Sequence, residues 1–193
     1  RTASWSTSIA AVSAVTSDNV KGMRDLLHYV YEKGHRKVAY IHGADSSVTR
    51  SRLASFYKTA AELGIEVPDE YIGKAAYRDT KATHIETERL LDLKDRPTCI
   101  LYPDDFACFG GINAIYERGL KIPHDISIAG YDGIRIGRHF EPQLTTVKQD
   151  TKGLGQSAAE KLISLIEHPK TTIIEQIVVE GEVYPGSSVG DLT

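Results

Sequence analysis

The chain has 193 residues, of which 41% are hydrophobic and 25% are charged, and its formal net charge is −3. This length is enough for one large or two small domains with a buried core. The acidic balance argues against nucleic-acid binding by this part of the chain alone, and no apolar run approaches the ~20 residues that a membrane-spanning helix needs.

The first half of the chain predicts helices alternating with buried strands. Residues 1–15 have neither a Lys/Arg-rich start nor a long hydrophobic centre, so we interpret them as a chain opened in the middle of a fold and not as a signal peptide. Asp18 is suited to cap a helix that ends at Gly34. The next expected elements are a strand at 37–43, a helix that follows the loop at 44–47 and ends at Gly64, and a strand at 71–77.

The second half continues the alternation. We expect a helix capped by Asp79 or Thr80 and a helix opened by Asp104-Asp105. Strands are predicted at 98–102, 126–129 and 144–149, a helix at 152–167, and two antiparallel strands between 173 and 189, separated near Gly181. This order predicts an α/β fold with a parallel sheet covered on both faces. The helices at Asp18 and at 152–167 are expected to cover a second sheet, which has too few strands in this sequence.

Polar residues recur where strands end and helices begin. Because the carboxyl ends of parallel strands meet at one edge, we expect these side chains to gather in a crevice there. Each of these residues could instead have only a structural role: Asp18 and Asp105 as N-caps, Arg52 as a surface cation and Tyr77 as a core residue. The candidate residues are Asp18, Arg52, Tyr77, Asp104 and Asp132.

The residue types at this predicted site indicate a class of ligand. Carboxylates accept hydrogen bonds from hydroxyl groups, Arg52 can donate to a ring or hydroxyl oxygen, and Tyr77 can stack on an apolar sugar face. Three carboxylates against one guanidinium would repel an anion, which favours a neutral polyol such as a sugar. A base or a nucleoside would satisfy similar groups.

Catalytic and metal-binding motifs are missing from the sequence. No HExxH, no zinc-type His/Cys spacing and no GxSxG occurs, so we predict no enzyme activity, no metal and no cofactor. Phe109-Gly110-Gly111 falls inside a predicted helix, which indicates close helix packing and not a phosphate loop. The two cysteines, Cys99 and Cys108, are predicted to be buried free thiols in a reducing cytoplasm.

Several motifs together resemble the LacI/GalR family of transcription regulators. They occur in the family's order over nearly the whole chain. They are SDNVKG at 17–22, GHRKVAYIHG at 34–43, SSVTRSRLASF at 46–56, RPTCILYPDDFACFGGINAIYERGLKIPHDISIAGYDG at 96–133, PQLTTVKQD at 142–150 and LGQSAA at 154–159.

This resemblance implies a type I periplasmic-binding-protein-like fold, with two α/β lobes joined by crossover strands and the effector in the cleft between them. Residues 36–145 and 170–193 would form a complete C-terminal lobe, and 1–35 and 146–169 a remnant of the N-terminal lobe. The family's effector contacts map onto Asp18, Arg52, Tyr77, Asp104 and Asp132, with Gln149 and Thr151 near the hinge.

The implied function is a ligand-sensing and dimerisation domain of a cytoplasmic repressor. A small neutral sugar would favour one arrangement of the lobes and so change operator binding through an N-terminal helix-turn-helix that this chain lacks. A homodimer is expected, with the helix at 106–118 bordering its interface, and no membrane partner. The alternatives are a secreted sugar-binding protein of an ABC transporter and an enzyme on the same scaffold.

Overall fold

The computed structural model describes residues 12–139 and 141–193 of the chain, which form two compact units. The larger unit contains Asp18–Gln149 and Glu180–Thr193, and the smaller unit contains the described residues 12–17 and Asp150–Val179. The chain passes from one unit to the other at 17–18, 149–150 and 179–180.

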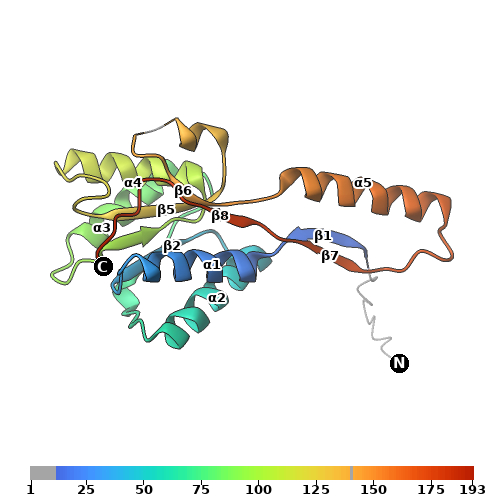
Figure 1. The fold of residues 1–193 in the computed structure, drawn as a ribbon, viewed down its shortest axis with the longest axis horizontal. Helices are drawn as coiled ribbons and strands as arrows, with labels where there is room; N and C mark the ends of the chain where they lie inside the picture. Colours follow the sequence, from blue (N-terminus) through green and yellow to red (C-terminus); the bar gives the residue numbers. More distant parts are fainter. Residues whose placement is uncertain (1–11, 140) are drawn as a thin grey trace, which may run out of the picture. The chain divides into compact units, whose positions relative to one another are not determined.

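A six-stranded sheet forms the centre of the larger unit (Figure 1). Its strand order is β3-β2-β4-β5-β6-β8, and every neighbouring pair is parallel except β6 and β8. The carboxyl ends of the five parallel strands therefore meet at one edge of the sheet. The strands are β2 (Val38–His42), β3 (Ile72–Lys74), β4 (Cys99–Leu101), β5 (Ser127–Asp132), β6 (Thr145–Lys148) and β8 (Glu182–Tyr184).

Helices cover both faces of this sheet, as the alternating pattern predicts. In Figure 1, α3 and α4 lie above the sheet, and α1 and α2 lie below it. One apolar cluster packs α1 and α2 against one face of the sheet, and a second apolar cluster packs α3 and α4 against the opposite face. The helices are α1 (Asn19–Glu32), α2 (Ser47–Leu63), α3 (Thr80–Leu91) and α4 (Asp105–Glu117), with short 3-10 turns at Asp69–Tyr71 and Arg135–Arg138.

Local sequence signals account for the helix ends. The Asp18 carboxylate accepts the Lys21 amide at 2.8 Å, and Asp79 and Asp104 cap α3 and α4 in the same way. Gly64 ends α2 with φ 68°, a left-handed conformation that favours glycine. The predicted caps at Asp18 and Asp79 are confirmed.

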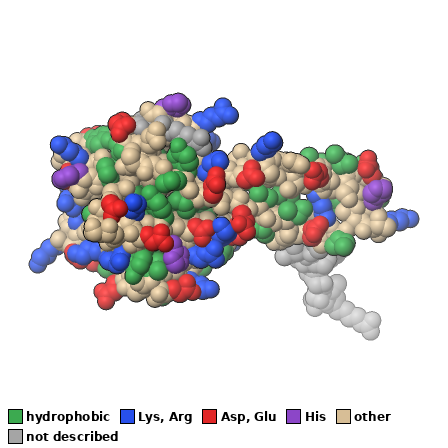
Figure 2. All heavy atoms as spheres, in the orientation of Figure 1, with side chains coloured by type: hydrophobic (Ala, Val, Ile, Leu, Met, Phe, Trp, Pro, Cys, Tyr) green, Lys and Arg blue, Asp and Glu red, His purple; other side chains and the backbone are tan. Residues whose placement is uncertain are grey.

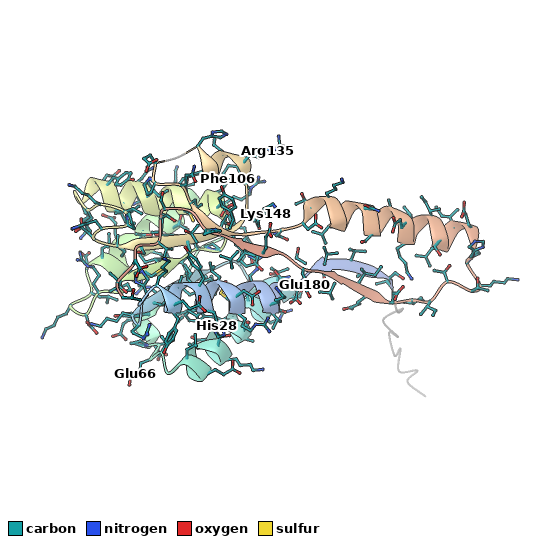
Figure 3. The ribbon with its side chains drawn as sticks, viewed as in Figure 1. His28, Glu66, Phe106, Arg135, Lys148 and Glu180 are labelled. Atoms are coloured by element: carbon teal, nitrogen blue, oxygen red, sulfur yellow. The ribbon has the colours of Figure 1, made fainter. Side chains whose placement is uncertain are left out.

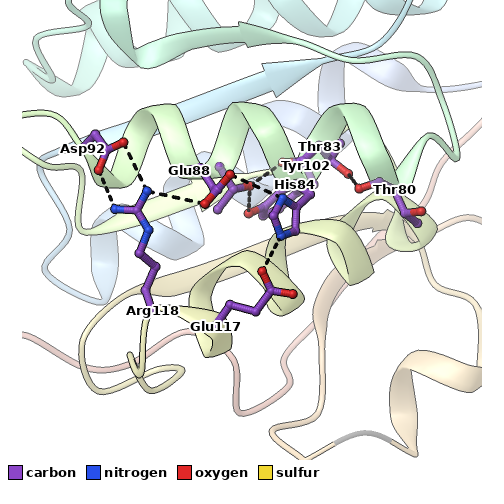
Figure 4. A network of polar contacts seen from close by, with 9 residues as sticks. Thr80, Thr83, His84, Glu88, Asp92, Tyr102, Glu117 and Arg118 are labelled. Carbon is purple, nitrogen blue, oxygen red and sulfur yellow. Dashed lines mark hydrogen bonds and ion pairs between the residues drawn. The ribbon is translucent and has the colours of Figure 1, made fainter.

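Helices α3 and α4 pack closely because α4 carries glycine at their contact. A Cβ atom on Gly110 would lie 2.0 Å from the Thr80 carbonyl oxygen, so the prediction of close helix packing is confirmed. A polar network also joins these helices (Figure 4). His84 Nε2 lies 2.9 Å from Glu117, and Arg118 pairs with both Glu88 and Asp92.

The smaller unit joins two strands and one helix. Strand β1 (Ala14–Ser17) pairs in parallel with β7 (Gln176–Val179), and both contact α5 (Thr151–Glu167). No residue of α5 is buried, and three of its large apolar side chains are more than half exposed: Leu162, Ile163 and Ile166. In Figure 2, hydrophobic and charged side chains both appear on the surface of this unit.

The structure corrects three sequence-based expectations and adds one strand that was not expected. The tail strands β7 and β8 do flank Gly181, but they belong to different sheets and do not pair with each other. Helix α1 buries Met23 and Leu26 against the six-stranded sheet, so it belongs to the larger unit and not with the described residues 12–17. Residues 170–179 belong to the smaller unit, and β1 was not predicted as a strand.

Other predictions concern burial and membrane insertion. Cys99 and Cys108 are both buried and free, as predicted. No helix among the described residues is long and apolar enough to cross a membrane. The interpretation of residues 1–11 lies outside the described residues. The assignment of the two units to the lobes of a larger fold stays a prediction.

Candidate functional site

The predicted site residues of the larger unit follow successive strands or begin helices at the carboxyl edge of the sheet. Arg52 lies in α2 after β2, and Tyr77 lies between β3 and α3. Asp104 lies between β4 and α4, and Asp132 ends β5. Gln149 directly follows β6, and Asp18 precedes α1. In Figure 3, the labelled residues Phe106 of α4 and Lys148 of β6 mark this end of the sheet.

Arg52 is a buried cation held by three different groups. Its side chain is 4% exposed, and its guanidinium carbon lies 3.4 Å from the centre of the Tyr131 ring. Nε donates to Asn19 Oδ1 at 2.8 Å, and Nη1 donates to the Pro103 carbonyl at 2.9 Å. Because a buried charge is unfavourable without such partners, these contacts fix the guanidinium in one orientation. The surface-cation alternative for Arg52 is therefore wrong.

Asp132 combines an unusual backbone with a direct side-chain partner. Its φ is 110°, a region that non-glycine residues rarely adopt. Its Oδ1 accepts a hydrogen bond from Gln149 Nε2 at 2.5 Å. Burial raises the pKa of this carboxyl group, whereas the hydrogen bond from Gln149 and the charge of Arg52 lower it. A strained residue held by its surroundings is typical of binding sites.

Asp104 is both a helix cap and a link to the segment before α3. Its side chain is 2% exposed, Oδ1 accepts the Ala107 amide at 2.8 Å, and Oδ2 accepts the Arg78 amide at 2.8 Å. Arg78 has a φ of 63°, and its guanidinium carbon lies 4.6 Å from the centre of the Phe106 ring. Arg78 and Asp132 are the non-glycine residues with positive φ in the described chain.

Tyr77 and Asp18 lie at this edge but are held mainly by their own neighbourhoods. The Tyr77 hydroxyl lies 2.8 Å from Thr49 Oγ1, and its ring lies so close to Gly43 that a Cβ there would be 2.4 Å away. Tyr77 is partly exposed, so the core alternative does not describe it fully. Asp18 is confirmed as the cap of α1, which leaves its ligand role as a prediction.

Sequence reasoning missed three residues that complete this arrangement, and the N-cap alternative for Asp105 is wrong because Asp104 caps α4. Asn19 accepts from Arg52, and Tyr131 stacks beneath Arg52. The Arg78 backbone binds Asp104, and Asp105 is a second, fully buried carboxylic acid next to it. Asp105 belongs to the noted Asp104-Asp105 pair and Tyr131 to the noted GYDG motif, but nothing local marks Asn19 or Arg78 as part of the site.

The arrangement is suited to binding a ligand with several hydroxyl groups. Carboxylate oxygens at Asp132 and Asp104 accept hydrogen bonds, Arg52 and the Gln149 amide donate, and their orientation is set before a ligand arrives. Burial also raises the pKa of the Tyr131 hydroxyl to about 12, so this group stays neutral. Among the described residues no cluster of three His, Cys, Asp or Glu side chains could hold a metal ion.

Known proteins share both the sequence and the fold of this chain. The model of the periplasmic binding protein-like domain matches residues 27–189. A Bacillus subtilis (strain 168) protein named "Probable HTH-type transcriptional repressor ExuR" is 31% identical over 183 residues, which cover 94% of this chain and 54% of that protein. The chain therefore spans about half the length of this curated relative.

Solved structures give the same picture. A regulatory protein of the LacI family from Chloroflexus aggregans has a TM-score of 0.83 at 27% identity, covering 91% of this chain and 63% of its own. The lac repressor dimer bound to operator and the anti-inducer ONPF has a TM-score of 0.84 at 25% identity, covering 93% of this chain and 53% of its own. The chain therefore belongs to the periplasmic binding protein-like family, in the form found in LacI-family transcriptional regulators.

Proposed function

We propose that this chain is the effector-sensing part of a cytoplasmic transcriptional repressor and is not an enzyme. A small neutral sugar binds at the carboxyl edge of the six-stranded sheet and changes DNA binding by a domain outside this chain. The relatives named as repressors support a regulator over the secreted transport protein that was the alternative. The effector contacts are Asp18, Arg52, Tyr77, Asp104, Asp132 and Gln149.

The observation that carries this proposal is the group formed by Arg52, Tyr131, Asp132 and Gln149. A guanidinium stacked on a buried ring lies beside a carboxylate that is bound by an amide, all at the carboxyl edge of a parallel sheet. Hydroxyl groups of a sugar can donate to Asp132 and accept from Arg52. An effector with different affinity for two states of the regulator shifts their populations, which is how binding would reach the DNA.

The test is a thermal-shift screen against neutral sugars, sugar acids and sugar phosphates. Saturating sugar should raise the unfolding temperature of the chain, because about 2.7 kcal/mol of stabilisation follows at a hundred times Kd. Replacing Arg52 with Met or Asp132 with Asn should abolish this shift. Arg50→Met is the matched control, because Arg50 lies on the same helix and its side chain is 67% exposed.

Loss of the shift in both site variants, with a normal shift in the Arg50 control, supports the proposal. The readout is the difference with and without sugar, and it is compared only among variants that keep a cooperative unfolding transition in the absence of sugar. A shift that survives in both Arg52→Met and Asp132→Asn contradicts the site. Operator binding is then measured with the full-length regulator, with and without the sugar that the screen identifies.

We also propose that the regulator is a homodimer that uses the α3–α4 face. Ile85 of α3 is 63% exposed and Tyr116 of α4 is 45% exposed, on helices that leave a hollow of about 300 Å³ beside Gly110. The lac repressor in the comparison is described as a dimer. An Ile85→Asp exchange should shift sedimentation toward the monomer, whereas Tyr57→Asp on α2, whose side chain is 42% exposed, should not.

A further inference from the structure

Asp105 is a buried carboxylic acid to which the proposed function gives no role. It is the first residue of α4 and only 1% exposed. Its Oδ1 accepts a hydrogen bond from the Thr146 hydroxyl at 2.7 Å, and its Oδ2 accepts the Ile134 amide at 2.8 Å. One side chain of α4 therefore holds both β6 and the loop after β5.

These contacts reach the residues that directly follow Asp132. The Gly133 amide donates to Thr146 Oγ1 at 3.2 Å, and the same hydroxyl donates to Asp105. Gly133 and Ile134 are thus both tied to Asp105, one through Thr146 and one directly. Because Asp132 has an unfavourable positive φ, its conformation depends on such contacts from neighbouring elements.

The backbone of β5 is adapted to this carboxyl group. A Cβ atom on Gly130 would lie 2.2 Å from Asp105 Oδ1, so only glycine lets the carboxyl group lie against the strand here. The first glycine of the GYDG motif therefore makes room for Asp105, two residues before Asp132. The motif and the buried acid form one packing unit.

The charged and titratable surroundings of Asp105 are mostly acidic. Asp132 faces it from β5, and Asp104 and the Cys108 thiol belong to its own helix. The positive charges of Arg52 and Arg78 lower the pKa of Asp132. Burial raises the pKa of Asp105 to about 7, and the charge of Asp132 also raises it, whereas the hydrogen bonds from Thr146 and Ile134 lower it.

We propose that Asp105 is a positioning residue for the effector site, which holds the backbone after Asp132 and changes this hold when it gains or loses a proton. The ionised group accepts hydrogen bonds at both oxygens. The protonated carboxyl group of Asp105 must instead donate a hydrogen bond, and Thr146 Oγ1 is the acceptor within reach. The direction of the bond between Asp105 and Thr146 is then reversed, so the Thr146 hydroxyl must donate its own hydrogen to another acceptor. Protonation therefore alters the hydrogen bonds that the Gly133 and Ile134 amides donate to Thr146 and Asp105.

The first test needs no effector. The isotope-labelled chain is titrated by NMR from about pH 5 to about pH 9, a window that brackets the expected transition. The side-chain carboxyl carbon of Asp105 and the amide of Ile134 should titrate together, with a midpoint near 7. In Asp105→Asn the Ile134 transition should disappear, whereas the exposed-site control Asp69→Asn should keep it.

Two results would overturn the positioning role. One is an Asp105 carboxyl carbon that shows no transition between about pH 5 and about pH 9. The other is an Ile134 transition that persists unchanged in Asp105→Asn. If that variant does not fold, the titration of the carboxyl carbon in the unmodified chain decides the question alone.

The second test rests on the proposed function and uses the sugar found by the thermal-shift screen. A bound sugar excludes water from Asp132, which makes a second ionised carboxylate beside it less favourable. Affinity should therefore fall as pH rises through 7, by at most about tenfold per pH unit for uptake of one proton. Asp105→Asn should bind with little change of affinity across this pH range, and Asp105→Ala should bind weakly at every pH.

The two tests fail in different ways. If no sugar binds the unmodified chain, the proposed function is wrong, and the NMR titration still decides the role of Asp105. If sugar binds with the same pH profile in the unmodified chain and in Asp105→Asn, the proposed function stands and the proton-linked role is refuted. A merely structural role would lower affinity in Asp105→Asn equally at every pH.

Discussion

The two units of the chain bury their apolar side chains to very different degrees. In the larger unit, α1 buries Met23, Leu26 and Leu27 completely against the sheet. In the smaller unit, α5 has the same length as α2 and an apolar sequence, yet it buries no residue. An apolar helix stripe becomes a source of stability only where a second layer covers it. The larger unit should therefore dominate the stability of the chain.

The largest expected effect contrasts two leucines. Leu26→Ala removes a fully buried side chain of α1 and should lower the free energy of unfolding by about 2–5 kcal/mol. Leu162→Ala on α5, where the side chain is 59% exposed, should change it by less than about 0.5 kcal/mol. Urea unfolding followed by circular dichroism measures both. Equal losses would show that α5 is buried in solution.

The next contrast uses two helix glycines. Gly110→Ala should destabilise the chain by about 1–3 kcal/mol, because the added methyl group would meet the Thr80 carbonyl 2.0 Å away. Gly155→Ala on α5 should stabilise it by about 0.5–1 kcal/mol, because alanine favours a helix and no heavy atom lies within 4 Å. Thermal unfolding of both variants tests whether these two changes in stability have opposite signs. Destabilisation by Gly155→Ala would contradict the open surface around α5.

The smallest effect is a pH dependence carried by His35. This histidine is 1% exposed, and its ring nitrogens lie 2.9 Å from Thr98 Oγ1 and 3.2 Å from the Gly190 carbonyl. Burial lowers its pKa, so the unfolded chain takes up this proton first and stability should fall as pH drops below about 6.5. Urea midpoints between about pH 8 and pH 5 should show this fall, and His35→Gln should reduce it.

The control for this pH effect is His168→Gln at the exposed end of α5. This exchange should leave the slope of the urea midpoint against pH as it is in the unmodified chain. A slope that is unchanged in His35→Gln, or that disappears in His168→Gln, would assign the effect to another group. Because His35 binds the tail at Gly190, loss of its contacts should also speed amide exchange in the last residues of the chain.

Much of the fold could be predicted because its signals are local. Asp18 and Asp79 cap helices through amides only three residues away, and Gly64 ends α2 through its own φ. The tail could not be predicted in the same way. Strands β7 and β8 look like a hairpin around Gly181, but their partners are β1 and β6, which lie far away in the sequence. Strand pairing depends on these non-local partners, and no local pattern reports them.

The candidate site divides in a similar way. Its position follows from the strand ends, so Arg52 and Asp132 could be chosen from the sequence. The partners of these residues could not. Asn19 and Tyr131 contact Arg52 only because α1 and β5 meet α2 in the folded chain. Asp104 and Asp105 are adjacent acids in the sequence, but the first caps α4 whereas the second turns toward β6 and the loop after β5.

The sequence by itself determined the alternation of elements, most helix ends and the edge of the sheet where polar side chains gather. These properties follow from hydrophobic periodicity and from contacts over three or four residues. Only the tertiary structure decided that α1 belongs to the larger unit, that Gln149 binds Asp132, and that Asp105 is a buried acid with a raised pKa. Burial and charge interactions depend on what surrounds a group in space, and that environment is assembled from distant parts of the chain.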